Sequence, residues 1–226
     1  MIEFQHVFKS YGRSRNILAD VNFQIKPGEF VFISGPSGAG KSTLLKLVGG
    51  LEQANRGLVT VNGHRIDKLN KRTLPYLRRT VGLILQDANL LFDRNAFDNV
   101  LLPLAVTGIE HATAKTRARA AMEKVGLRGK EEMFPIELSG GEQQRLAIAR
   151  AIVGKPAILI ADEPTANLDA KSAKLIMDVF RDFNQYGVTT LIASHDKDLM
   201  ANYANRKLLL DNGRFADISL GAKAQL

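Results

Sequence analysis

The sequence predicts an α/β protein with a mostly parallel sheet and a helical block inserted into it. Short apolar runs typical of buried strands alternate with helical segments, both before residue 95 and after residue 155. Such alternation favours parallel strands covered by helices. Between about residues 95 and 150 the strand signals vanish and helical spacing dominates, which predicts the insertion.

The expected strands and helices follow from apolar runs and turn signals. The strands are expected at residues 2–7, 21–25, 30–34, 58–61, 81–85, 157–161, 188–193 and 207–210. The helices are expected at residues 42–48, 112–124, 142–152 and 171–186. One apolar face is predicted on the last of these helices, made of Leu175, Ile176, Val179, Phe180 and Phe183.

Composition limits the class of protein. A chain of 226 residues that is 45% hydrophobic suits one large domain, or one domain with an inserted subdomain. The absence of cysteine excludes disulfides, thiolate metal sites and cysteine nucleophiles. There is no apolar run of the ~18 residues that a bilayer requires and no signal-peptide pattern, so we expect a soluble protein.

The net charge of +8 favours anionic partners, which could be nucleotides, acidic lipid headgroups or nucleic acid. Runs of like charge stay short, so a solvated basic surface accounts for most of this charge.

A glycine-rich loop spans residues 35–42 with the spacing G-x-x-x-x-G-K-S, between an expected strand and an expected helix. This spacing predicts binding of ATP or GTP, because backbone N–H groups and the helix N-terminus cradle phosphates. Lys41 would meet the β- and γ-phosphates, and Ser42 would hold Mg²⁺. The predicted nucleotide-binding residues are Gly35, Pro36, Ser37, Gly38, Ala39, Gly40, Lys41, Ser42 and Thr43.

Two acidic residues end the expected strand at residues 157–161. A carboxylate at the end of a buried strand requires a cation, so Asp162 is predicted as a Mg²⁺ partner. Glu163 points elsewhere and is predicted as the general base that polarises the attacking water.

Residues 138–145, Leu-Ser-Gly-Gly-Glu-Gln-Gln-Arg, complete a pattern that resembles the ATP-binding cassette (ABC) superfamily over nearly the whole chain. The resemblance implies a P-loop NTPase (RecA-like) core at residues 1–87 and 155–226, with an antiparallel β region. It also implies a helical signature subdomain at residues 88–154. In this superfamily two subunits pair head to tail, and the signature of each caps the ATP held by the other. The residues that would act in trans are Ser139, Gly140, Gly141, Glu142 and Asp169.

The resemblance assigns further positions in the cis site. Tyr11 would stack on adenine, although an exposed turn tyrosine is the alternative. Gln86 would meet Mg²⁺ and water, and His195 would touch the γ-phosphate. Catalysis would thus rest on Glu163, His195, Lys41 and Gln86, with Mg²⁺ held by Ser42, Gln86 and Asp162.

Segments at residues 89–94, 98–100 and 134–145 resemble the FtsE branch of the superfamily, which serves cell division. That resemblance implies an ATPase on the cytoplasmic side of the bacterial inner membrane, at the septum. There it would dock on an integral membrane partner of the FtsX type that regulates cell-wall hydrolases. The docking groove is expected around Leu91, Phe92, Asp93, Phe97 and Val100, and the alternative for these apolar residues is subdomain core.

Other functions stay open to different degrees. The ATPase subunit of an exporter or of a lipoprotein-release transporter would carry the same catalytic residues. A nucleic-acid maintenance ATPase would need the long coiled coils or zinc insertions that this chain lacks, so we expect no nucleic-acid partner. A scaffold that does not hydrolyse ATP is disfavoured by the presence of Glu163 and His195.

Overall fold

The computed structural model describes residues 1–12 and 16–218. Its main sheet has six strands in the order β10-β9-β3-β8-β7-β6. All neighbours in it are parallel except β10, which pairs antiparallel with β9. The strands are β3 (Phe30–Ser34), β6 (Val81–Ile84), β7 (Ile158–Asp162), β8 (Thr189–Ala193), β9 (Arg206–Asp211) and β10 (Arg214–Asp217). The predicted mostly parallel sheet is confirmed.

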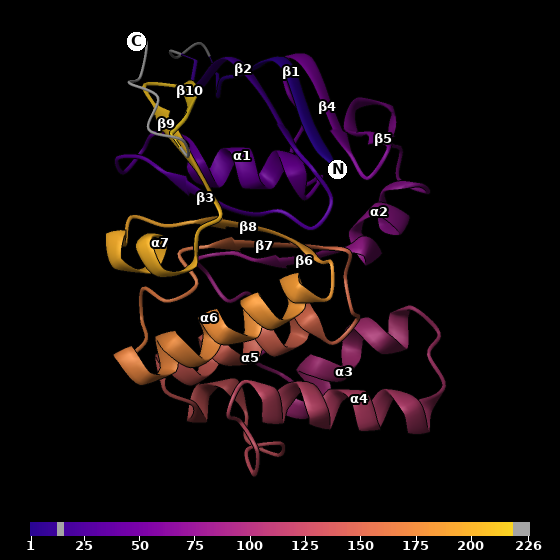
Figure 1. The fold of residues 1–226 in the computed structure, drawn as a ribbon. Helices are drawn as coiled ribbons and strands as arrows, with labels where there is room; N and C mark the ends of the chain where they lie inside the picture. The colour runs from indigo at the N-terminus through magenta and orange to yellow at the C-terminus, as the bar shows by residue number, and fades with distance from the viewer. Residues whose placement is uncertain (13–15, 219–226) are drawn as a thin grey trace.

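A second sheet of four antiparallel strands, in the order β2-β1-β4-β5, stacks on the first. Its strands are β1 (Ile2–Lys9), β2 (Leu18–Ile25), β4 (Arg56–Val61) and β5 (His64–Arg65), followed by a 3-10 turn, η1 (Ile66–Lys68). Helix α1 (Lys41–Val48) lies between the two sheets (Figure 1). Its buried leucines join both sheets into one apolar cluster.

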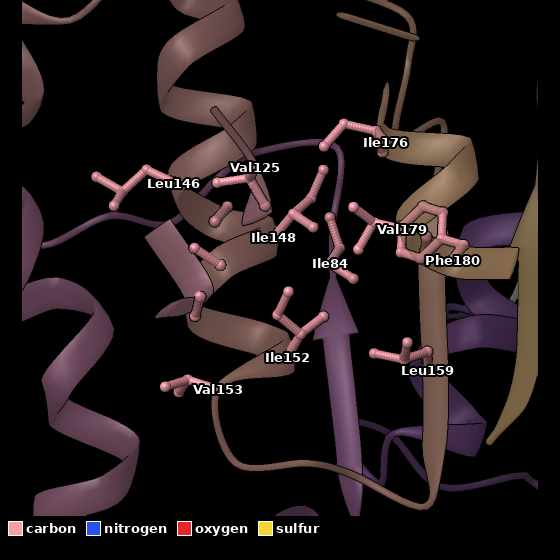
Figure 2. Close-up of a cluster of buried hydrophobic side chains, with 14 of the residues drawn as sticks. Ile84, Val125, Leu146, Ile148, Ile152, Val153, Leu159, Ile176, Val179 and Phe180 are labelled. Carbon is pink, nitrogen blue, oxygen red and sulfur yellow. The ribbon is translucent and has the colours of Figure 1, made fainter. Parts of the chain in front are cut away.

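The other face of the main sheet is covered by helices. Helices α5 (Gly140–Ile152) and α6 (Ala170–Gln185) lie directly on it, and α3 (Ala96–Val106) and α4 (His111–Lys124) form the outer layer (Figure 1). Figure 2 shows Ile84 and Leu159 of the sheet facing Ile148 of α5 and Phe180 of α6. The predicted helical block therefore shares one continuous core with the sheet.

Three short helical elements complete the chain: α2 (Leu74–Thr80), η2 (Pro135–Glu137) and α7 (Lys197–Tyr203). None of the described helices is long and apolar enough to cross a membrane.

Two of the expected apolar positions differ in burial. Leu175 is 38% exposed, whereas Ile176, Val179 and Phe180 of α6 are buried. Val100 is fully buried between Ala96 and Leu104 on the inner face of α3, so it belongs to the core and not to a docking groove. By contrast, Phe92 is 57% exposed.

Candidate functional site

A cleft of about 640 Å³ opens at the carboxyl ends of the parallel strands β3, β6, β7 and β8. Parallel strands place their carboxyl ends at one edge, where ligands bind in open α/β sheets. Residues from five separate segments meet there: Ile17, Gly35, Pro36, Ser37, Gly38, Gly40, Lys41, Ser42, Thr43, Gln86, Asp162, Glu163 and His195. The structure thus brings together almost all of the predicted cis residues.

The loop between β3 and α1 depends on glycine. Gly35, Gly38 and Gly40 have φ angles of 148°, 77° and 105°, a region that side chains rarely adopt. A Cβ atom at Gly35 would lie 2.1 Å from the carbonyl oxygen of Leu210. The Nζ atom of Lys41 donates to the carbonyl oxygens of Gly35 at 2.7 Å and Pro36 at 3.0 Å. The ammonium group is therefore held over the loop, at the start of α1, where the positive helix end adds to its field.

Asp162 is the last residue of β7 and is 3% exposed. Burial raises the pKa of its carboxyl group, the hydrogen bond from the Ser42 hydroxyl lowers that pKa, and the charge of Glu163 raises it further. A buried carboxylate in contact with a serine hydroxyl beside a phosphate loop is the arrangement that attracts a cation.

Glu163 and His195 form a pair across neighbouring strands. Nδ1 of His195 lies 2.7 Å from Oε1 of Glu163, and the backbone N–H of Glu163 donates to the carbonyl oxygen of Ala193. Glu163 has a φ of 48°, which is uncommon for a residue with a side chain and typical of strained functional positions. The Glu163 side chain is 15% exposed, whereas that of His195 is 74% exposed.

The oxygen donors suit magnesium. Ser42, Gln86 and Asp162 offer a hydroxyl, an amide and a carboxylate oxygen in one cleft, the donor types that Mg²⁺ takes together with substrate phosphates. Within the described part of the chain, no cluster of three or more His, Asp or Glu side chains could hold a metal by itself. The residues therefore fit a Mg²⁺ ion that is shared with a nucleotide.

Tyr11 and Ala39 stand apart from the lining of the cleft. The Tyr11 hydroxyl donates to Glu52, and Nζ of Lys9 lies 5.0 Å from its ring centre. Tyr11 is 43% exposed, so its ring is open to stacking on a base. The stacking itself stays a prediction. Ala39 is buried, and its N–H donates to the carbonyl oxygen of Pro36.

The signature residues begin α5. Ser139 caps this helix: its Oγ accepts from the N–H of Glu142, and Oε2 of Glu142 accepts from the N–H of Ser139. Lys130 donates to Oε1 of Glu142, and this hydrogen bond is the main reason that the pKa of Glu142 falls to about 2. Ser139, Gly140 and Gly141 thus stand at a fixed, positively polarised helix end.

The segment around Asp169 is tied to the same helix. Asp169 caps α6 and accepts from the Ser172 hydroxyl at 2.7 Å, while Arg145 of α5 donates to the same hydroxyl at 2.9 Å. A Cβ atom at Gly141 would lie 3.3 Å from the carbonyl oxygen of Asn167. None of the five predicted trans residues lines the cleft of their own chain in the described structure.

The family model described as ABC transporter matches residues 18–166. Curated relatives include the cell division ATP-binding protein FtsE of Escherichia coli K12, which is 49% identical over 94% of this chain and 96% of its own length. The chain belongs to the ABC transporter family.

The ABC assignment extends along the rest of the chain. The FtsE protein of Mycobacterium tuberculosis is 43% identical over 95% of this chain and 94% of its own. A solved dimeric structure of the ATP-binding cassette MJ0796, bound to ADP and Pi, matches with a TM-score of 0.91 and 33% identity. That match covers 96% of this chain and 99% of the other. The present chain is therefore an ABC-family ATPase with the same cassette fold.

The sequence patterns do not identify Lys130 and Ser172. Neither residue belongs to a motif, and each acts only by holding a motif residue in place. The capping spacing of Ser139 and Glu142 was a usable signal for the fixed helix end.

Proposed function

We propose that the protein is the Mg²⁺-dependent ATP-hydrolysing subunit of an FtsE-like complex and that it works as a homodimer. The Glu163–His195 pair facing Lys41 and Ser42 across one cleft carries this proposal. A carboxylate, a histidine and a phosphate loop converge as phosphoryl transfer to water requires.

In the proposed mechanism, ATP lies with its phosphates along the glycine loop. Lys41 exchanges neutral carbonyl acceptors for phosphate oxygens, which form stronger hydrogen bonds with a charged donor. Ser42, Asp162 and Gln86 would hold a Mg²⁺ ion, which when bound would supply neutralising charge. Glu163 orients a water molecule for in-line attack, and His195 keeps that carboxylate in place through Nδ1. When Nε2 of His195 also carries a proton, it donates to the γ-phosphate.

The head-to-tail homodimer supplies the missing anion cradle. Ser139, Gly140, Gly141 and Glu142 of each subunit would cap the ATP of the other, with Asp169 beside them. This arrangement is supported by their position outside their own cleft and by the dimeric structures of the MJ0796 cassette. Binding of ATP and closure of the dimer then favour each other, because the nucleotide contacts both subunits.

Glu163→Gln tests the catalytic part. The variant should bind ATP, fail to hydrolyse it and accumulate as a closed dimer that size-exclusion chromatography detects. Arg128→Gln, which removes a side chain from an exposed ion pair with Glu123, is the control and should turn over normally. Normal turnover in Glu163→Gln would remove Glu163 from its role.

We further propose that the dimer docks on an integral membrane partner of the FtsX type, on the cytoplasmic side of the bacterial inner membrane at the division septum. The FtsE relatives, at 40–49% identity, support this branch. Affinity purification from solubilised native membranes tests it. A partner with few spans and a large extracytoplasmic domain is expected. A many-spanning permease or a lipoprotein-release component would favour the transport alternative and leave the ATPase assignment intact.

A further inference from the structure

Two clefts share a wall at the end of the molecule opposite the nucleotide cleft. One, of about 670 Å³, lies between α4 and the ends of α5 and α6, and the other, of about 570 Å³, lies between α2, β6 and the end of α3. Arg117 and Pro156 line both. Val81 begins β6 and Pro156 precedes β7, so this surface lies at the amino ends of the parallel strands. We call the residues lining these two clefts the amino-end face. Helix α2, which contributes to it, is on the right in Figure 1.

The amino-end face carries only one sign of charge. Its cations are Arg78, Arg79, Arg117, Lys124, Arg150 and Lys155, and its lining includes no Asp or Glu, although the chain has 23 of them. Lys124 pairs with Asp182, and Arg78 and Arg150 donate to backbone carbonyls. Within residues 1–12 and 16–218, Arg79, Arg117 and Lys155 make no salt bridge to a carboxylate.

Large apolar side chains stand out from the same face. Tyr186 is 87% exposed and lines one cleft, and Val106 is 65% exposed and lines the other. Tyr76 lines neither cleft but lies beside the face: it is 65% exposed, and the guanidinium of the lining residue Arg79 is 5.1 Å from the centre of its ring. Exposed tyrosines among unpaired cations have the composition of a membrane interface, where the ring meets the acyl boundary and the cations meet phosphates.

We propose that the amino-end face binds the surface of an anionic lipid bilayer directly. Arg79, Arg117 and Lys155 contact headgroup phosphates, and Tyr76, Val106 and Tyr186 rest at the level of the headgroups. Nucleic acid would match the charge but would leave Val106 and the open apolar floors without a partner. Because the face lies at the other end of the strands from the nucleotide cleft, lipid contact leaves that cleft accessible. In the proposed head-to-tail dimer the two copies of this face point away from each other, so a bilayer meets the face of one subunit only. The proposal deepens the membrane placement proposed above, but it requires no protein partner.

Vesicle flotation with the purified full chain tests this proposal. The chain should float with vesicles that contain phosphatidylglycerol, remain behind with pure phosphatidylcholine vesicles, and bind more weakly, though not vanishingly, as salt is raised. Arg117→Gln/Lys155→Gln should weaken vesicle binding about 25-fold, taking about fivefold for each cation near an anionic leaflet. The double variant should keep the ATPase rate of the unmodified chain, which separates its failure from failure of the proposed ATPase function.

Lys171→Gln/Lys174→Gln is the matched control. It removes the same charge from exposed positions at the start of α6. These positions are at the opposite end of the helix from Tyr186, which belongs to the amino-end face. This control should float normally. Equal loss in both double variants, equal binding to phosphatidylcholine, or no binding at all would overturn the proposal. So would binding of a fluorescent DNA duplex that Arg117→Gln/Lys155→Gln abolishes. Tyr186→Ser/Val106→Ser should reduce the vesicle binding that survives high salt. Unchanged binding in this variant would show that the two side chains do not contact the bilayer.

Discussion

Nδ1 of His195 lies 2.7 Å from Oε1 of Glu163, although the residues are 32 positions apart. They follow β7 and β8, which are neighbours in the sheet, so the backbone fixes this approach. His195→Ala should lower kcat about 100-fold, the lower end for loss of one hydrogen-bond donor to the transition state, with little change in stability. His6, 2.8 Å from Asp20 and equally exposed, offers the matched control. Steady-state ATPase assays should show that His6→Ala behaves as the unmodified chain; equal activity in both variants would deny His195 a role.

Lys41→Ala should weaken ATP binding about 10- to 100-fold, because a hydrogen bond from a charged donor contributes about 1.5–3 kcal/mol. Fluorescence titration with a labelled ATP analogue measures the effect. Lys46→Ala, further along α1 and outside the lining of the cleft, is the control. Unchanged affinity in Lys41→Ala would refute the loop assignment.

Asp162→Asn should make the protein more stable at neutral pH while abolishing hydrolysis. Burial raises the pKa of Asp162, so the folded state binds a proton more readily than the unfolded state. Stability then falls as pH rises above the ordinary value of 3.8 through the raised folded pKa. The Asn variant escapes this loss, so its advantage in Tm should grow from about pH 4 towards neutrality. Asp198→Asn, at an exposed position of α7, should show no such growth.

Lys130→Met should loosen the start of α5. The pKa of Glu142 is held at about 2, chiefly by Lys130, so the ion pair adds stability above the ordinary value of 4.5. That stability is lost as pH falls towards 2. Urea unfolding at neutral pH should show a cost of about 0.5–1 kcal/mol that shrinks below pH 4.5. Glu142→Gln keeps an acceptor for the N–H of Ser139 and should cost the same or less. A cost independent of pH would show that the lysine acts through packing.

The strongest local signals predicted the sheet well. Strand β3 (Phe30–Ser34) matches its expected bounds, because a five-residue apolar run meets a glycine that must turn. Strand β10 was not expected, although the Asn212-Gly213 turn before it was visible in the sequence. Both turn residues have positive φ, at 48° and 75°, as a tight hairpin requires. Helix α7 has only seven residues and too little periodicity to be found.

The residues of the site are predictable from the sequence where they belong to a chemical motif. They are not predictable where they only hold a motif residue in place. The loop glycines, Lys41, Ser42, Asp162 and Glu163 meet in one cleft as the spacing predicted. Apolar residues near the signature subdomain could not be divided in advance, because core-facing and partner-facing positions look alike in a sequence. Val100 proved to be core for this reason. The predicted subdomain boundaries at residues 87/88 and 154/155 remain a prediction.

The hydroxyl of Ser172 is shared by Arg145 and Asp169, so one small side chain anchors both segments that would reach towards a neighbouring subunit. Substitutions at these three positions should therefore be epistatic: a double change at 145 and 172 should cost less than the sum of its single changes. The residue types at these three positions are therefore expected to vary together among relatives. A designer who replaces one of the three residues must also choose new residues at the other two positions.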